Sequence, residues 1–289
     1  MKRVTAILDT DTYNEVDDQF ALAHLLLHDE TIDLQAVHAA PFFNSRSSGP
    51  GDGMEKSYEE IQRMLELVGP KVPPAVYRGS TSYLPDARTP VESEAVRDLI
   101  ERALAAKETL YVLTIGACTN VASALLLEPR IAEKIQIVWL GGHAPHWENT
   151  REFNLAQDPH ATRILLDGPA PLVLVPCIPV ASHLKTTVAE LEKELAPFSR
   201  LGAYLTDIVS DYGGNRLGWS KVIWDIAVSG WLIERKWVRT LSMPSPVLRD
   251  DITWEQPTPA TRRQIDVAVQ VDRDSIFADF FTRARNSGS

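Results

Sequence analysis

Short apolar runs alternate along this chain with longer segments of helical periodicity, and this alternation limits the fold more than any other feature. Apolar runs typical of buried strands cover residues 4–8, 32–38, 110–115, 135–140, 172–175 and 265–271. Apolar residues spaced three and four apart predict helices at 19–27, 54–68, 91–103, 120–127 and 159–166, and the chain from 187 to about 232 is predicted to be mainly helical. Strands that alternate with helices form βαβ units, so we predict an α/β fold with an open, mainly parallel sheet and helices on both faces. Because α/β folds of this length are often single units, residues 1–289 are expected to form one domain.

The charge balance argues against several classes of partner. The chain has 39 acidic residues against 29 basic ones, a net charge of −10 with His neutral. Binding to a nucleic-acid backbone or an anionic membrane needs clustered Lys and Arg, so neither partner is expected. The two cysteines, Cys118 and Cys177, are too few for a disulfide framework, which favours a reducing compartment. Only five uncharged residues separate Arg3 from Asp9, so no signal peptide is expected and we predict a cytoplasmic location.

Parallel sheets bind their ligands at the carboxyl ends of the strands, which directs attention to the loops that follow each predicted strand. These loops are residues 9–18, 39–49, 115–120, 141–154 and the segment after 175. The first of them holds five carboxylates in ten residues: Asp9, Asp11, Glu15, Asp17 and Asp18.

An ordinary helix start explains part of this acidic loop. Asp17 can cap the following helix and Asp18 can favour its dipole. Neither role explains Asp9 and Asp11, which alternate at the end of an apolar strand. Carboxylates crowded into one crevice repel one another, and a bound cation removes that penalty. Because oxygen ligands suit Ca²⁺ or Mg²⁺ rather than Zn²⁺, the spacing indicates a site for one of those two ions.

Two known families place Asp-x-Asp after a first strand. Asp9 and Asp11 partly match the haloacid-dehalogenase-like phosphohydrolases, in which Asp9 would be the nucleophile and Asp11 the acid/base. That family also carries a second acidic pair late in the chain, and no Gly-Asp-x-x-x-Asp occurs here. The resemblance to the phosphohydrolases is therefore confined to one motif.

The second family matches along most of the chain. The matching segments are Asp9-Thr10-Asp11 with Asp17-Asp18, Val76-Tyr77-Arg78-Gly79, Gly116-Ala117-Cys118-Thr119-Asn120, Gly141-Gly142, Glu152-Phe153-Asn154 with Asp158-Pro159-x-Ala161, and Asp225-Ile226-Ala227. In this order and at comparable spacing they resemble the motifs of the inosine-uridine-preferring nucleoside hydrolases, from residue 4 to about residue 230. Each motif alone is weak, whereas six in register are a specific signal.

The resemblance implies an activity, a metal and a role for each matching residue. Members of the family cleave the N-glycosidic bond of ribonucleosides with a tightly held Ca²⁺. Asp11 would take a proton from the attacking water. The ligands of the ion would be the side chains of Asp11, Asp18 and Asp225 and the backbone carbonyl of Ile115. The ribonucleoside would contact Asp17, Glu152, Asn154 and, by a looser match, Asn44.

The chemistry agrees with these residue types. A glycosidic bond breaks through a transition state in which the sugar resembles an oxocarbenium ion. Carboxylates around the sugar stabilise the developing positive charge. A cluster of acids therefore suits both a metal ion and the reacting sugar.

The sequence departs from the family on the side of the leaving base. Members often have His before the late Asp, where it protonates the base, but Trp224 stands there in this chain. An indole only donates a hydrogen bond and cannot serve as that acid. His143 and His146 are the natural substitutes, although loop histidines are more often simply solvated. Trp224 together with Tyr212 and Trp219 forms either an aromatic wall for a planar base or ordinary core, since aromatics at helical spacing are more often core.

Two loops are also unusual. Residues 12–16, between the Asp-x-Asp and Asp-Asp pairs, make a longer stretch than members commonly have, and Glu15 within it would either reach the substrate or be solvated. Residues 41–53 are rich in Gly, Ser and Pro, which is typical of a lid or of an ordinary irregular loop.

Several alternatives stay open from sequence alone. The sugar-binding residues are kept while the base-protonating His is absent, so a hydrolase of another ribosyl or sugar-linked substrate is the nearest alternative. A non-catalytic, metal-bearing sugar or nucleoside binder is a second, which the intact Asp11 disfavours. The resemblance further implies a homodimer or homotetramer.

Overall fold

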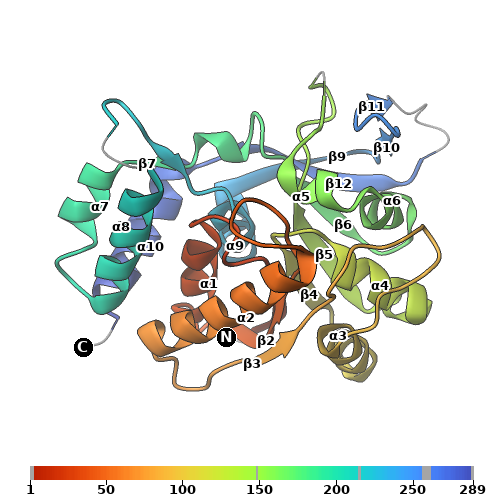
Figure 1. Cartoon of the computed structure of the whole chain (residues 1–289), viewed down its shortest axis with the longest axis horizontal. Helices are drawn as coiled ribbons and strands as arrows, with labels where there is room; N and C mark the ends of the chain where they lie inside the picture. The colour runs from red at the N-terminus through yellow and green to blue at the C-terminus, as the bar shows by residue number, and fades with distance from the viewer. Residues whose placement is uncertain (1–2, 148, 214–215, 256–261, 288–289) are drawn as a thin grey trace.

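The central feature of the fold is an open sheet with helices on both faces. The computed structural model describes residues 3–147, 149–213, 216–255 and 262–287. Within these residues eight strands pair in the order β3-β2-β1-β4-β5-β6-β12-β9. All neighbouring pairs are parallel except β12 with β9. The predicted α/β class with a mainly parallel sheet is confirmed (Figure 1).

The strands and helices have the following bounds. The sheet strands are β1 Val4–Thr10, β2 Ile32–Ala39, β3 Ala75–Arg78, β4 Leu110–Thr114, β5 Ile135–Leu140, β6 Leu172–Val175, β9 Val238–Pro244 and β12 Gln264–Val271. Two short pairs are β7 Lys185–Thr186 with β8 Lys221–Val222, and β10 Val247–Leu248 with β11 Trp254–Glu255. The helices are α1 Asp18–Leu26, α2 Pro50–Val68, α3 Glu94–Ala105, α4 Thr119–Leu127, α5 Phe153–Gln157, α6 Pro159–Asp167, α7 Val188–Glu194, α8 Arg200–Gly213, α9 Ile226–Ile233 and α10 Arg273–Arg285. None of the helices in the described ranges combines the length and apolar character needed to cross a bilayer.

Side chains alternate between the two faces of the sheet and build two cores. In β1, Ala6 and Leu8 pack into one hydrophobic cluster and Ile7 into the other, as the period of two in a strand requires. The first cluster lies under α1, α2, α8, α9 and α10, and the second under α3, α4 and α6. Because strands such as β1 are covered on both faces, they read as continuous apolar runs in the sequence.

The sheet has a topological switch point between β1 and β4. From β1 the chain builds outward through β2 and β3, then returns to the other side of β1 with β4 and continues outward. The carboxyl ends of these two strands lie against each other, since Asp9 pairs with Thr114 and the Ile115 N–H donates to the Asp9 carbonyl at 2.9 Å. A crevice outside such a point is where open α/β sheets bind ligands.

The structure departs from the sequence predictions at the edges of the sheet. Strand β3 was recognised only as a motif, and β9 and α10 were not predicted. Strand β9 lies at the sheet edge with most residues partly or fully exposed, so it lacks the apolar run that marks the inner strands. The loop predicted at 41–53 ends earlier, because α2 begins at Pro50, a residue suited to a first helical position. Likewise α3 begins at Glu94 rather than at Val91, after Ser93 caps it by accepting a hydrogen bond from the Val96 N–H.

Candidate active site

Five aspartates converge where β1 ends and α1 and α9 begin. Asp9 belongs to β1, Asp11 follows it, Asp18 is the first residue of α1, and Asp225 immediately precedes α9. These four side chains and that of Asp17 are all buried, each with at most 4% of its surface exposed. The end of β1 and the starts of α1 and α9 therefore place residues that are distant in sequence at one buried position.

The carboxylates differ in how far their oxygens are satisfied. Asp9 accepts from the Asn120 amide at 2.7 Å, and Asp18 accepts from the Thr10 hydroxyl at 2.6 Å. Neither oxygen of Asp11 has a hydrogen-bond partner among the described residues. A buried carboxylate without donors is costly, and a cation is the partner that removes this cost.

Burial and mutual repulsion shift these groups strongly. Burial raises the pKa of Asp9 to about 7, and burial together with the charge of Asp17 raises that of Asp18 to about 7. The pKa of Asp11 lies well above its ordinary value because of burial first and the charge of Asp18 next. Burial and the charges of Asp18 and Asp17 raise the pKa of Asp225 in the same way. Without a cation this cluster resists ionisation.

Asp17 differs from the other carboxylates because its oxygens are occupied. One oxygen pairs with the Lys221 ammonium at 3.0 Å, and the other accepts from the Trp224 N–H at 3.0 Å. Lys221 also pairs with Glu15. Asp17 sits at the N-cap position of α1 but makes no side-chain cap bond, so the expected capping role is wrong. Its side chain instead reaches the strand–helix connection that leads to α9.

The metal ligands expected from sequence are partly grouped. Oxygens of Asp17, Asp18 and Asp225 lie within 4.8 Å of one another, whereas Asp11 lies outside this set of three. Asp11 is nevertheless close enough to be among the charges that raise the pKa of Asp225.

Two glycines are required by close approaches at this point. A Cβ at Gly116 would stand 3.0 Å from the carboxyl carbon of Asp11, so the glycine lets β4 end beside that carboxylate. A Cβ at Gly79 would stand 2.0 Å from the Ala39 carbonyl and 2.5 Å from the Asn120 amide. Packing around the acids therefore accounts for the glycines of two of the sequence motifs.

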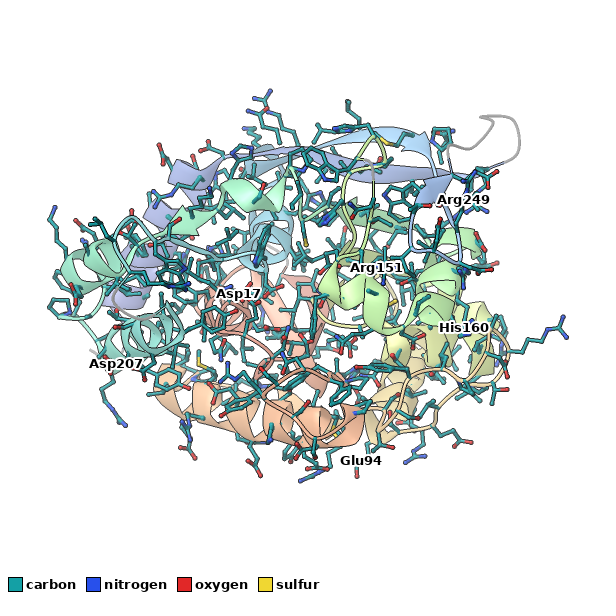
Figure 2. The ribbon with its side chains drawn as sticks, turned by 45° about the horizontal axis from the view of Figure 1, so that its top comes forward. Asp17, Glu94, Arg151, His160, Asp207 and Arg249 are labelled. Carbon is teal, nitrogen blue, oxygen red and sulfur yellow. The ribbon has the colours of Figure 1, made fainter. Side chains whose placement is uncertain are left out.

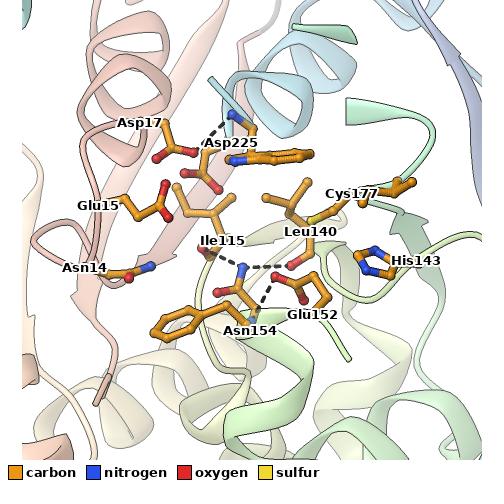
Figure 3. Close-up of a pocket in the computed structure, with 13 residues that line it drawn as sticks. Asn14, Glu15, Asp17, Ile115, Leu140, His143, Glu152, Asn154, Cys177 and Asp225 are labelled. Atoms are coloured by element: carbon orange, nitrogen blue, oxygen red, sulfur yellow. Dashed lines mark hydrogen bonds between the residues drawn. The ribbon is translucent and has the colours of Figure 1, made fainter. Parts of the chain in front are cut away.

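A cavity of about 230 Å³ opens above these carboxylates. It is lined by Asn14, Glu15, Asp17, Ile115, Leu140, His143, Glu152, Phe153, Asn154, Cys177, Ile178, Trp224 and Asp225. Glu15, Asp17 and Asp225 gather on one side, while His143 and Cys177 lie on the opposite side (Figure 3). The cavity therefore has an acidic side and a less charged side.

Glu152 and Asn154 lie in the cavity wall but are firmly held. Glu152 is the N-cap of α5, and its carboxylate accepts from the N–H groups of Gly142, Asn154 and Leu155 at 2.8–3.1 Å. The Asn154 amide donates to the carbonyls of Ile115 and Leu140, both at 3.1 Å. These contacts tie the ends of β4 and β5 to the start of α5, which fixes the cavity floor.

The remaining predicted residues divide into those that line the cavity and those that do not. His143 and Trp224 line it, whereas His146 is exposed outside it. Asn44 is also outside, and its amide donates to the carbonyl and the side-chain oxygen of Asn14, a lining residue. The proposed aromatic wall reduces to Trp224.

The other two aromatics of that wall lie elsewhere. Trp219 packs against Gly213 and the hydrophobic core, and Tyr212 is 43% exposed with its ring 5.3 Å from the Lys221 ammonium.

The loop at 41–49 is braced rather than free. The Arg46 guanidinium donates to the Glu15 carbonyl at 2.7 Å and lies 4.1 Å over the Tyr13 ring. Lys56 of α2 in turn donates to the Arg46 carbonyl at 2.8 Å. The loop therefore supports the acidic loop from outside.

The sequence did not reveal Lys221, the cation that pairs with Glu15 and Asp17. A lysine three residues before Trp224 carries no motif, and only the fold brings it beside α1. Cys177, Ile178 and Leu140 were missed as lining residues for the same reason, since apolar residues after strands resemble core.

Comparison with known proteins agrees with this geometry. Residues 6–278 match the family described as inosine-uridine preferring nucleoside hydrolase. An uncharacterised protein of Schizosaccharomyces pombe is 30% identical over 169 residues, which are 48% of this chain and 53% of that protein. An inosine-uridine preferring nucleoside hydrolase of Leishmania major is 32% identical over 94 residues, 31% of this chain and 30% of that protein. The chain thus spans about half, or less, of the length of these curated relatives.

Solved structures show the same fold along the whole chain. A plant nucleoside hydrolase superposes with a TM-score of 0.77 over 99% of this chain and 100% of its own, at 19% identity. A purine-preferring ribonucleoside hydrolase from Gardnerella vaginalis superposes with a TM-score of 0.74 over 97% of this chain and 98% of its own, at 22% identity. The family match covers nearly the full length, and the motifs behind it surround the buried acids. The chain therefore belongs to the inosine-uridine preferring nucleoside hydrolase family.

Proposed function

We propose that this protein hydrolyses the N-glycosidic bond of ribonucleosides and releases free base and ribose, using a bound Ca²⁺. The observation that carries the proposal is the buried Asp11 carboxylate, which has no hydrogen-bond donor among the described residues and lies among other carboxylates near a cavity. Family membership supplies the reaction class, and the relatives include hydrolases of inosine, uridine and other ribonucleosides.

The residues fit a hard divalent cation. We assign its ligands to the side chains of Asp11, Asp18 and Asp225 and to the Ile115 carbonyl. Asp17 is not assigned, because the Lys221 ammonium already balances its charge, whereas Asp11, Asp18 and Asp225 have no cationic partner among the described residues. A set made only of oxygens favours Ca²⁺ over Zn²⁺.

The reaction needs a nucleophile and charge stabilisation. When bound, the ion supplies positive charge that orients the ribose diol and lowers the pKa of water. Asp11, to which no group in the described part of the chain donates a hydrogen bond, takes the proton from the attacking water. The carboxylates of Asp17 and Glu152 face the sugar and stabilise the positive charge that develops as the bond to the base breaks.

The sugar site is built by residues that are themselves held in place. Glu152 and Asn154 are fixed by backbone groups from β4, β5 and α5, so they meet a ribose without reorganisation. Asn44 acts one step away by holding Asn14 in the cavity wall. We therefore assign Asn44 a supporting role behind Asn14, in place of the direct contact with the ribonucleoside expected from the sequence.

Departure of the base needs an acid, and we assign this role to His143. It lies in the cavity wall opposite Glu15, Asp17 and Asp225, and its Nδ1 is buried without a partner among the described residues. Burial lowers the pKa of His143, so its imidazolium form is a stronger acid than a free histidine and is left as a neutral imidazole after it gives a proton to the departing base. His146 is exposed and does not meet this requirement.

One experiment tests the reaction class. The protein with Ca²⁺ is incubated with a panel of purine and pyrimidine ribonucleosides, and release of base and of ribose is followed. Turnover that needs Ca²⁺ and disappears in Asp11→Asn supports the proposal. Binding of nucleosides without release of base would instead indicate a non-catalytic binder. Release from another ribosyl or sugar-linked compound alone would support the alternative that Trp224 suggests.

Three further expectations stay predictions. They are a single domain over residues 1–289, a homodimer or homotetramer, and a cytoplasmic location. Light scattering of the purified chain tests the second, and limited proteolysis tests the first.

A further inference from the structure

A second group of metal-binding side chains lies away from the cavity. His24 of α1, His28 just beyond its end and Asp279 of α10 place ligand atoms within 4.8 Å of one another. Both histidine side chains are at most 2% exposed, and that of Asp279 is 23% exposed. The proposed hydrolysis does not use any of the three.

The distances match the edge of a tetrahedral ligand shell. The Nε2 atoms of His24 and His28 lie 3.0 and 3.2 Å from the same Asp279 Oδ2. Ligands at Zn–N and Zn–O distances near 2.0–2.1 Å in a tetrahedral site stand about 3.3 Å apart. The three atoms therefore already form most of one face of such a shell.

His28 turns one ring nitrogen to a backbone carbonyl and the other to a carboxylate. Its Nδ1 lies 2.9 Å from the His24 backbone carbonyl, which only accepts, so Nδ1 carries a proton. Its Nε2 lies 3.2 Å from Asp279 Oδ2 and is buried without a well-directed hydrogen bond among the described residues. Either a proton on Nε2 or a metal ion bound by both atoms satisfies this arrangement.

His24 fits the same pattern. Its Nδ1 lies 3.0 Å from the Ser229 hydroxyl, which passes its own proton to the Ile226 carbonyl at 3.1 Å. Its Nε2 lies 3.0 Å from the same Asp279 Oδ2, so both histidines turn one ring nitrogen to that oxygen. Metal-ligating histidines typically hold their second nitrogen in this way, on a carbonyl or another oxygen.

Contacts on the other side of the Asp279 carboxylate leave one of its oxygens for the histidines. Asp279 Oδ1 pairs with the Arg283 guanidinium at 3.4 Å, which leaves Oδ2 facing the histidines. Arg283 is itself neutralised by Glu30 at 2.7 Å. The partial exposure of Asp279 gives water access to a fourth ligand position.

We propose that His24, His28 and Asp279 bind a divalent transition metal ion, Zn²⁺ being the best fit, at a site separate from the catalytic cavity. Two imidazoles and one carboxylate suit Zn²⁺ and exclude Ca²⁺ as the preferred ion. The ion joins the end of α1 to α10, and the partner of His24, Ser229, is in α9. Helices α1 and α9 both begin at the proposed catalytic carboxylates. The ion therefore holds parts of these helices that lie away from the cavity, and this helps to fix the positions of Asp18 and Asp225.

The test measures metal binding directly, without reference to activity. The full chain is stripped of metal, supplied with excess Ca²⁺ to fill the carboxylate site, and titrated with Zn²⁺ in a calorimeter. One equivalent is expected to bind tightly, and His28→Gln should weaken binding at least about 100-fold, since even loss of an outer-shell partner costs 10–100-fold. His160→Gln, in helix α6, is the matched control and should bind like the original chain.

Two further readouts keep the outcome decisive. Co²⁺ at an imidazole-bearing tetrahedral site gives a visible absorption band that should disappear in His28→Gln and persist in Asp11→Asn. Zn²⁺ should also raise the Tm of the unaltered chain, as any ligand specific for the folded state does, even if a variant does not fold. Absence of Zn²⁺ binding, equal binding by His28→Gln, or binding lost only in Asp11→Asn would each overturn the proposal.

Discussion

The two sides of the cavity are built on different principles. On the acidic side Lys221 balances Asp17, whereas Asp225 and the buried Asp11 and Asp18 have no cationic partner among the described residues. The other side presents apolar groups, the imidazole of His143 and the Glu152 carboxylate, which backbone N–H groups hold in place. The first arrangement needs a cation and a sugar that becomes positive, whereas the second suits a flat, weakly charged group.

This difference assigns the chemistry of the reaction to separate walls. The acidic wall is fixed by the ends of β1 and β4 and the starts of α1 and α9, all parts of the rigid sheet. The opposite wall comes from the loops after β5 and β6. Activation of water therefore belongs to the scaffold, while recognition and protonation of the leaving base belong to loops.

The largest effect is expected on the acidic wall. Asp11→Asn keeps the shape of the side chain but removes the base and one anionic ligand. We expect kcat/KM for ribonucleosides to fall at least about 1,000-fold, within the range for loss of a positioned base. The control is Asp207→Asn, which alters an exposed aspartate of α8 at the edge of the molecule, away from Asp17 (Figure 2). Activity above a tenth of the original in Asp11→Asn would contradict the assignment.

The second effect tests the opposite wall. His143→Gln removes the proposed acid, and we expect kcat for natural ribonucleosides to fall about 100-fold. A riboside whose leaving group departs as a stable anion needs no proton and should lose little. His146→Gln is the control, because that side chain is exposed and does not line the cavity. Equal slowing of both kinds of substrate would show that His143 acts on structure rather than on the leaving group.

The two walls also differ in how well the sequence predicted them. Asp11, Asp18 and Asp225 sit at strand ends and helix starts, where the pattern of polar residues after apolar runs is visible. Oxygens of Asp18 and Asp225 lie within 4.8 Å of each other, and the third carboxylate of that group is Asp17 rather than Asp11. The pairing of Asp17 with Lys221 joins elements about two hundred residues apart, and no local pattern encodes it.

The fold followed the same rule. The inner strands are buried on both faces and were predicted to within two residues, including β5 and β6 with the same bounds. The edge strand β9 was missed because an exposed edge has no continuous apolar run. Helix α10 was missed although its buried residues recur at helical spacing: Ile276, Phe277, Phe280, Phe281 and Ala284. Apolar residues of the second wall, such as Leu140 at the end of β5 and Ile178 after β6, resemble core until the cavity beside them is known.

A smaller effect is expected where the scaffold meets the acidic wall. Gly116→Ala places a Cβ 3.0 Å from the carboxyl carbon and one oxygen of Asp11, so that carboxylate must shift by a few tenths of an ångström. Since a misplacement of about 1 Å can cost about 100-fold, we expect kcat/KM to fall about 10-fold with the fold retained. Gly49→Ala is the matched control, because a Cβ there meets nothing within 4 Å and the backbone is extended. An unchanged rate in Gly116→Ala would mean that the exact position of Asp11 does not limit the reaction.

The smallest effect separates the two roles of Trp224. Its backbone N–H holds Asp17 on the acidic wall, while its side chain lines the cavity where the base is expected. Trp224→Leu keeps the first role and removes the aromatic face, whose interaction with another ring is worth about 0.5–1.5 kcal/mol. We therefore expect KM for purine ribonucleosides to rise about 5-fold while kcat and Ca²⁺ affinity stay unchanged. The control is Trp147→Leu, which alters an exposed indole and should leave KM, kcat and Ca²⁺ affinity unchanged. A loss confined to kcat would show instead that the indole acts on the leaving group. Trp224 would then take part in the reaction itself, and the assignment of chemistry to two separate walls would be wrong at this residue.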